Sequence, residues 1–207
     1  KDISFELYEG EILGITGLIG SGRTQLALAL FGIGPPDTGE ILIDGKAVDI
    51  KSVQDAVEAG ISYVPESRLT QGLVLKKSVG ENIVTPILRS LLNQFNLIDY
   101  DRWESVVDEW VKALNIKVSE PAVMVQTLSG GNQQRVVIAK WLAAKPKIVI
   151  LNGPTVGIDV MAKSSINGII HDLAKECIGV ILISDEAAEV VNNSNRILIM
   201  RSGKIFT

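Results

Sequence analysis

The chain has few residues of several types, and each shortage excludes a class of protein. Its 207 residues include one cysteine, Cys177, and one histidine, His171. A single cysteine excludes an internal disulfide framework and is typical of proteins in a reducing compartment. No apolar run reaches the roughly 18 residues that a membrane-spanning helix requires. The sequence therefore predicts one globular domain without a transmembrane segment.

The chain also lacks a strong excess of either positive or negative charge. The formal net charge is −4, and no block of basic residues occurs along the chain. Because proteins that bind DNA or RNA concentrate Lys and Arg, this balance does not indicate a nucleic-acid partner. Aromatic residues make up 5% of the chain, and Trp103 and Trp110 share helical spacing with apolar neighbours. We expect these tryptophans to pack in a core rather than to bind a ligand.

A glycine-rich segment, Gly17 to Thr24, lies between an expected buried strand at 12–16 and an expected buried helix at 25–31. Strand, glycine-rich loop and helix are the setting of a phosphate-binding P-loop, in which backbone N–H groups and a helix N-terminus face an anion. Arg23 stands where the P-loop consensus has lysine, and the Thr24 hydroxyl can bind Mg²⁺. A glycine turn without any ligand is the alternative interpretation.

The rest of the chain alternates strands with helices. We expect further strands at 3–7, 61–64, 148–151 and 180–184, and helices at 53–59 and 160–176. Hairpins are expected at 40–48, where Asp44-Gly45 suits a type I′ turn, and at 197–206. Between about 78 and 118 the pattern is helical. Strands that alternate with helices predict a mainly parallel sheet, here with one helical insertion in the middle.

An amphipathic helix opens with a second motif, Leu128-Ser129-Gly130-Gly131-Asn132-Gln133-Gln134. Ser129 suits the N-cap position, and the two glycines leave the first backbone N–H groups open to an anion. A merely capped helix is the alternative, but it does not need two adjacent glycines followed by polar amides. A P-loop, about a hundred further residues, this motif and then a buried strand resemble the nucleotide-binding cassette of ABC ATPases.

The resemblance covers nearly the whole chain and implies an α/β fold, the P-loop NTPase of the ABC ATPase type. This fold has a mainly parallel core sheet, a small antiparallel β part and an inserted helical subdomain, here at about 72–140 of a single domain over 1–207. The resemblance also implies ATP and Mg²⁺ as cofactors. In this family two cassettes meet head to tail, and the signature helix of each completes the ATP site of the other.

Carried over position by position, the resemblance assigns nucleotide binding to several segments. They are the P-loop residues Gly17, Leu18, Ile19, Gly20, Ser21, Gly22, Arg23, Thr24 and Gln25, the signature residues Leu128, Ser129, Gly130, Gly131, Asn132 and Gln133, and Glu66, Asn152, Asp159 and Asp185. Thr24 is the expected metal ligand. Glu66 replaces the usual glutamine of the Q-loop. Asp159 falls in the D-loop, which lies across the seam between two cassettes.

Three positions depart from the family where its chemistry takes place. Asn152 replaces the aspartate that holds Mg²⁺ through water, and an amide binds a hard cation less well than a carboxylate. Gly153 replaces the glutamate that activates water, so no catalytic residue is assigned; losing a general base typically costs about 100- to 10,000-fold. Asp185 replaces a histidine that contacts the γ-phosphate, and we expect His171 to be a solvated helix residue. The hypothesis is a nucleotide site with weak or no turnover.

A finer resemblance is to the second cassette of the tandem ATP-binding proteins of bacterial monosaccharide importers. It is carried by the P-loop with Arg23, by Tyr-Val-Pro-Glu-Ser-Arg at 63–68 and by the signature motif. It implies that an upstream first cassette on the same longer chain, which would also supply the adenine-stacking loop, is the head-to-tail partner. It further implies membrane permease subunits and a peripheral location on the cytoplasmic face of the plasma membrane.

Two alternatives from other functional classes remain open. One is a non-transport ABC protein, such as a DNA-repair or translation ATPase, which long heptad arms or basic patches would support. The other is a regulatory cassette that binds nucleotide and drives nothing. A neighbouring permease gene and a gene for a periplasmic sugar-binding protein would favour the importer.

Overall fold

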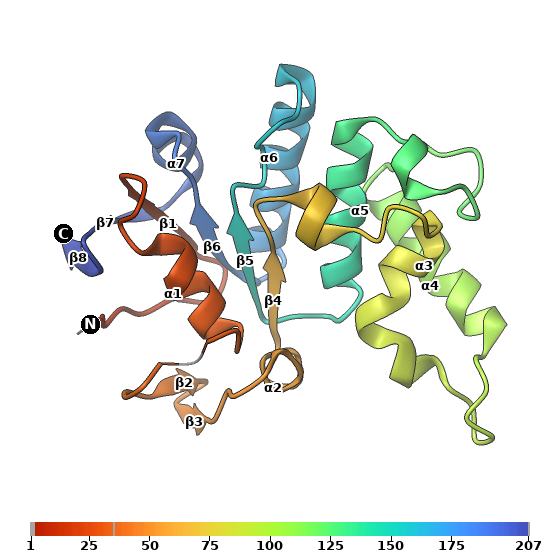
Figure 1. Cartoon of the computed structure of the whole chain (residues 1–207), viewed down its shortest axis with the longest axis horizontal. Helices are drawn as coiled ribbons and strands as arrows, with labels where there is room; N and C mark the ends of the chain where they lie inside the picture. Colours follow the sequence, from red (N-terminus) through yellow and green to blue (C-terminus); the bar gives the residue numbers. More distant parts are fainter. Residues whose placement is uncertain (1–2, 35, 207) are drawn as a thin grey trace. The chain divides into compact units, whose positions relative to one another are not determined.

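The computed structural model describes residues 3–34 and 36–206, which fall into two compact units (Figure 1). The first unit lies within 1–63, 146–154 and 167–207, and the second comprises 64–145 and 155–166. Each unit is therefore assembled from segments far apart in the sequence. In the first, segments near both ends of the chain, red and blue in Figure 1, lie together.

The described residues form a six-stranded sheet that supports the P-loop. Its strands, in spatial order, are β4 (Ile61–Val64), β5 (Ile148–Asn152), β6 (Gly179–Ile183), β1 (Ile12–Gly17), β7 (Arg196–Arg201) and β8 (Lys204–Phe206). The pairs β5–β6, β6–β1 and β1–β7 are parallel, and β7–β8 is an antiparallel hairpin. Strand β6 is buried along its whole length, as continuous apolar runs in parallel sheets generally are. The predicted mainly parallel sheet is confirmed.

Short elements complete the first unit. The predicted hairpin consists of β2 (Ile41–Ile43) and β3 (Lys46–Val48), joined by Asp44 and Gly45 with φ of 52° and 73°. Both values lie in the left-handed region that a type I′ turn requires. Helix α2 (Val53–Glu58) follows, capped by Ser52, whose hydroxyl accepts a hydrogen bond from the Asp55 N–H.

Two helices pack on the central strand of the first unit. Helix α1 (Arg23–Leu30) contacts β1 and β5, and helix α7 (Ala187–Asn193) contacts β1. The sequence pattern gave no indication of α7, because seven residues are too few to display helical periodicity clearly. This helix begins two residues after Asp185 and so helps to fix the backbone near one of the predicted nucleotide positions.

The predicted strand at 3–7 is wrong. Side chains 3–8 alternate between half-buried and exposed, as the pattern indicated, but they belong to no strand of the described chain. The carbonyl oxygen of Glu6 accepts a hydrogen bond from Arg196 Nη2 at 2.6 Å. A side chain therefore satisfies this backbone oxygen in place of a neighbouring strand. Alternation predicted burial correctly and strand pairing incorrectly.

The second unit is mainly helical. It contains a π-helical turn, η1 (Arg68–Gly72), the helices α3 (Val79–Val84), α4 (Tyr100–Ala113) and α5 (Gly130–Leu142), and the 3₁₀ turns η2 (Thr85–Leu91) and η3 (Val125–Thr127). The helical pattern expected from 78 to 118 is interrupted at 92–99, where Asn96 has a φ of 58°. Helix α6 (Val160–Lys175) begins in the second unit and ends in the first.

Helix α4 has the predicted apolar face. Val107 and Leu114 are buried, and Trp103 and Trp110 are half-buried. The Trp103 ring lies so close to Gly80 of α3 that a Cβ there would be 2.4 Å from the ring. Trp103 therefore packs against a neighbouring helix, as expected. None of the helices in the described ranges is long and apolar enough to cross a bilayer.

Candidate functional site

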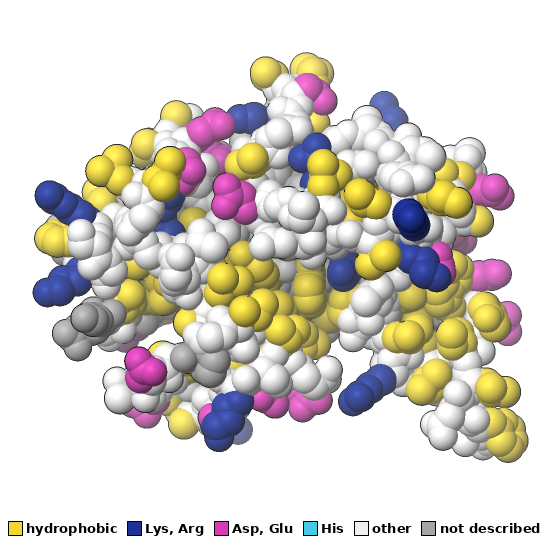
Figure 2. All heavy atoms as spheres, viewed as in Figure 1, with side chains coloured by type: hydrophobic (Ala, Val, Ile, Leu, Met, Phe, Trp, Pro, Cys, Tyr) yellow, Lys and Arg dark blue, Asp and Glu magenta, His cyan; other side chains and the backbone are white. Residues whose placement is uncertain are grey.

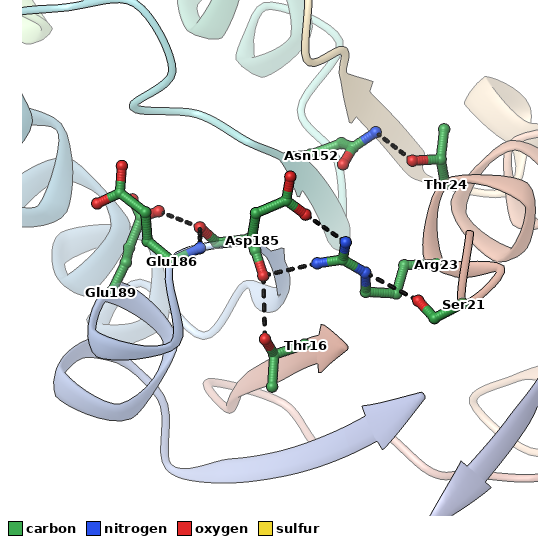
Figure 3. Close-up of polar contacts among 9 residues, drawn as sticks. Thr16, Ser21, Arg23, Thr24, Asn152, Asp185, Glu186 and Glu189 are labelled. Atoms are coloured by element: carbon green, nitrogen blue, oxygen red, sulfur yellow. Dashed lines mark hydrogen bonds and ion pairs between the residues drawn. The ribbon is translucent and has the colours of Figure 1, made fainter. Parts of the chain in front are cut away.

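The P-loop joins β1 to α1 in the first unit, as predicted (Figure 3). Gly20 and Gly22 have φ of 81° and 101°, a conformation that glycine adopts without a Cβ clash. Gly22 is the N-cap of α1, and no side chain of the described residues caps the first turn of this helix. The backbone N–H groups of Arg23, Thr24 and Gln25 therefore lie at an uncapped helix N-terminus, which is suited to an anion such as phosphate.

The Arg23 side chain is bonded inside the fold. It is 7% exposed; its Nη1 donates to the Ser184 carbonyl oxygen at 2.8 Å, and its Nε donates to Ser21 Oγ at 3.1 Å. Its Nη2 forms an ion pair with Asp185 (Figure 3). Two of the predicted nucleotide-binding residues, both departures from the family pattern, thus bind each other. The positive charge of the P-loop arginine is therefore paired with a carboxylate of the same chain.

Ser184 and Glu189 fix the backbone on either side of Asp185. The sequence pattern gave no indication of this role. Ser184 Oγ donates to Glu189 Oε2 at 2.5 Å and accepts from the Glu186 N–H at 3.1 Å. The Ser184 carbonyl oxygen also accepts from Thr16 Oγ1 at 3.2 Å, in addition to Arg23. These contacts depend on α7, which places Glu189 beside the end of β6.

Asn152 lies at the carboxyl end of β5, beside the P-loop threonine (Figure 3). It is 4% exposed, and its Nδ2 donates to the Tyr63 hydroxyl at 3.1 Å and to Thr24 Oγ1 at 3.5 Å. An amide N–H therefore faces the hydroxyl that would bind Mg²⁺. No cluster of three or more His, Cys, Asp or Glu side chains able to hold a metal exists in the part of the chain that the structure describes. The site suits phosphate through its backbone and suits Mg²⁺ poorly.

The backbone at Gly153 suits glycine rather than a glutamate. Its φ is 58°, and its N–H donates to the Ile183 carbonyl oxygen at 2.8 Å. A side chain at this position would strain the backbone, and β5 ends without a carboxylate. His171 is exposed on α6, as expected, and its Nε2 lies 3.2 Å from Asn193 Oδ1. The histidine therefore offers no replacement base at the P-loop.

The signature motif opens α5 in the second unit. Ser129 is exposed and occupies the predicted N-cap position, but its Oγ accepts from Asn132 Nδ2 at 3.1 Å and from no backbone N–H of the described chain. The first N–H groups of α5, including those of Gly130 and Gly131, are therefore without a side-chain cap. The Gln133 side chain points into the unit: it is 7% exposed, and its Nε2 donates to the Val125 carbonyl oxygen at 3.3 Å.

The other predicted positions of the second unit are exposed. Asp159 precedes α6, and its Oδ1 accepts from the Ala162 N–H at 2.9 Å, so its side chain caps this helix. Glu66 is also exposed, two residues before Arg68. Arg68 is the residue that sequence reasoning missed, because it was noted only as the end of a motif. Its guanidinium donates to the carbonyl oxygens of Val156 and Gly157 at 3.0 and 3.1 Å.

Comparison with known proteins agrees with this geometry. The family model described as ABC transporter matches residues 1–156. The ribose import ATP-binding protein RbsA of Caldanaerobacter subterraneus is 44% identical over 205 residues, 99% of this chain and 41% of that protein. The RbsA protein of Bacillus subtilis is 43% identical over the same shares. The chain thus spans about two fifths of the length of these relatives.

Solved structures agree on the fold. The ATP-binding cassette MJ0796, in a dimeric post-hydrolysis state bound to ADP and phosphate, superposes with a TM-score of 0.82. The match covers 100% of this chain and 88% of that one at 22% sequence identity. The predicted fold class is therefore confirmed: an α/β cassette of the ABC type with a mainly parallel sheet and a small antiparallel sheet.

Proposed function

The chain belongs to the ABC transporter family, and on that premise we propose that it is an ATP-binding cassette of a bacterial monosaccharide importer. Its similarity to ribose import ATP-binding proteins extends over 99% of its length. Because the chain spans 41% of such a relative, we assign it to one of two cassettes on a tandem protein. The P-loop with Arg23, shared with second cassettes, favours the second position.

The Arg23–Asp185 ion pair is the observation that carries the functional proposal. To reach a phosphate, the guanidinium must leave Asp185, Ser21 and the Ser184 carbonyl oxygen. The Asp185 carboxylate would meanwhile repel the phosphates, and the glycine at 153 supplies no general base. We therefore infer that this P-loop holds ATP weakly and does not turn it over. Mg²⁺ would neutralise phosphate charge if bound at Thr24, but Asn152 supports it poorly.

The signature helix has the opposite properties, which support a role at another cassette's nucleotide. The first N–H groups of α5 have no side-chain cap among the described residues, and Ser129 is exposed beside them. In this proposal they bind the phosphates of ATP held on the P-loop of the partner cassette. ATP then joins the two surfaces, so closure of the cassette pair is linked to nucleotide occupancy.

The helical unit is the proposed contact with the permease. We assign the inserted helical subdomain to about 72–140. We propose that Glu66 transmits the closure of the cassette pair to this subdomain. Figure 2 shows hydrophobic side chains gathered over the helical elements at the right of the view. Exposed apolar residues of the second unit between 64 and 145 are Leu69, Val74, Leu88, Phe95, Leu97, Tyr100 and Met124. Such a surface suits a membrane protein partner and a peripheral place on the cytoplasmic face of the plasma membrane.

The test compares three rates of ATP hydrolysis: this chain alone, the partner cassette alone, and the two together. We expect hydrolysis only where the partner's P-loop is present, and a higher rate in the mixture. Arg23→Ala should leave the rate of the mixture unchanged. Magnesium-dependent hydrolysis by this chain alone that Arg23→Ala abolishes would refute the inactive site. A mixture no faster than the partner alone would refute the signature's role.

A regulatory cassette that binds nucleotide but drives nothing is the second candidate, favoured by the same loss of carboxylates at 152 and 153. Sugar uptake by the assembled transporter separates the two. If a substitution in the signature motif abolishes uptake, this cassette takes part in the transport cycle. If uptake continues at the normal rate, the regulatory role is supported.

A further inference from the structure

The π-helical turn η1 is fixed on the middle of helix α5. Lys140 Nζ donates to the Gly72 carbonyl oxygen at 3.1 Å. A Cβ on Gly72 would lie 2.9 Å from Val137 Cγ2, so the turn approaches α5 as closely as a glycine allows. These contacts hold η1 against α5, and so position the Arg68 side chain at the start of the turn.

The Arg68 guanidinium connects two segments of the second unit. Its Nε donates to Gln133 Oε1 of α5 at 3.3 Å, and its Nη1 and Nη2 donate to the carbonyl oxygens of Val156 and Gly157 at 3.0 and 3.1 Å. These acceptors are all neutral. The described ion pairs do not include Arg68, and the oxygens that it bonds carry dipoles rather than full charges.

Arg68 also lies against the start of the signature helix. A Cβ built on Gly130 would be 2.9 Å from Arg68 Nη2. The cation is therefore next to the open N–H groups of α5 and adds positive potential where the helix dipole already favours an anion. A larger residue at 130 would displace it, which gives a physical reason for the first glycine of the motif.

Other contacts hold the start of α6 to α5, and Arg68 bonds the loop before it. A Cβ on Gly131 would be 2.8 Å from Ala162 Cβ, and Arg135 Nη2 donates to Ser165 Oγ at 2.8 Å. Both contacts belong to the helix itself. Val156 and Gly157 are exposed, and their carbonyl oxygens are bonded by Arg68.

We propose that Arg68 is a positioning residue that holds the loop 155–159 against the signature helix. The loop and the start of α5 then contact the partner's nucleotide as a single rigid surface. This inference rests on the proposed function, in which these surfaces face another cassette. Glu66 and Arg68 then share one short segment: the first is exposed toward a partner, and the second fixes the nucleotide-facing backbone. Arginine is required because three acceptors in two segments need a planar fork, which lysine lacks.

The test uses the assembled transporter with Arg68→Ala, Arg68→Lys and, as a control, Arg201→Ala, which removes an exposed arginine outside both proposed surfaces. Hydrogen exchange at 155–159 should accelerate in Arg68→Ala, with no change in the sheet of the first unit. The kcat for ATP hydrolysis should fall roughly 10-fold at unchanged KM, because misplaced groups slow turnover more than they weaken binding at a distant P-loop. Arg68→Lys should restore only part of this loss.

Two results would overturn the proposal: exchange at 155–159 that matches the wild type in Arg68→Ala, or a kcat no lower than that of Arg201→Ala. A general loss of protection across the second unit would also overturn it, because that result indicates a purely structural role. Failure of the proposed function is distinguishable. In that case Ser129→Asp leaves hydrolysis unchanged, whereas the exchange at 155–159 still responds to Arg68.

Discussion

The P-loop and the signature motif both place glycines at the N-terminus of a helix, where phosphate could bind. The structure gives the two N-termini different charge surroundings. At the P-loop, Arg23 is 7% exposed and bonded to three partners, one of them Asp185. At the signature, Ser129 is exposed and the first N–H groups lack a side-chain cap within the described chain. The guanidinium nearest to them, that of Arg68, is held by neutral oxygens.

This difference shows that the backbone shape of a nucleotide-binding motif and the charges around it are separate properties. The P-loop backbone retains its shape although the side chains around it balance their charges internally. The signature retains an uncompensated positive end. In the proposed function, a pair of cassettes has one productive ATP site, and the other P-loop serves as a contact surface. The following predictions test that contrast, in order of decreasing effect.

Ser129→Asp should produce the largest effect. A carboxylate at an N-cap stabilises a helix, so α5 should remain folded and the melting temperature should not fall. The same negative charge repels phosphate, and we expect hydrolysis by the assembled pair to fall about 100-fold or more, as when an oxyanion donor is lost. Steady-state hydrolysis and thermal unfolding measure the two properties. Ser129→Ala is the control, and a Ser129→Asp protein with the wild-type rate would remove the distinction between the two regions.

Asp185→Asn should leave the positive charge of the P-loop unpaired, as it is at the signature motif. Loss of the carboxylate releases Arg23 and removes a negative charge near the bound phosphates, so ATP should bind this P-loop roughly 3- to 10-fold more tightly. Titration of a fluorescent ATP analogue into the chain measures this affinity. Asp172→Asn, which removes an exposed carboxylate paired with Lys175, is the control. Equal affinities for the wild type and Asp185→Asn would show that the ion pair does not limit binding.

Gly153→Ala tests whether the backbone at this position requires a glycine. With φ at 58°, a Cβ should destabilise the fold by about 1–2 kcal/mol. Gly168→Ala in α6 is the matched control, because a Cβ there meets no atom within 4 Å. That change should stabilise the protein by about 0.5–1 kcal/mol through helix propensity. Urea unfolding of both variants provides the comparison, and equal stabilities would contradict the strain at 153.

The smallest expected effect lies away from both anion sites. Lys77 and the Ser78 N–H bond to Glu81 at the start of α3 and lower the pKa of its carboxyl from 4.5 to about 2. A lowered pKa means that the contribution to stability is complete above pH 4.5 and disappears as the pH falls toward 2. Since Glu81 is exposed, we expect only about 0.5 kcal/mol. The melting-temperature difference between the wild type and Glu81→Gln should shrink over that pH range, and a constant difference would contradict this account.

Much of the fold could be predicted from local pattern. Continuous apolar runs indicated β5 and β6, and Asp44-Gly45 indicated a type I′ hairpin. The segment at 3–7 failed because alternation reports burial, whereas a strand also needs a neighbour with free backbone groups. Helix α7 was missed because it is short, and with it the contacts of Ser184 and Glu189.

The sequence by itself determined which chemical groups this protein has at its phosphate-binding segments: an arginine at 23, no carboxylate at 152 or 153, and two glycines before the α5 amides. Only the tertiary structure decided what those groups do. Arg23 and Asp185 are 162 residues apart, and Arg68 reaches carbonyl oxygens 88 and 89 residues away. Sequence patterns report local conformation and burial, but a charge acts on whatever the fold places within a few ångströms of it.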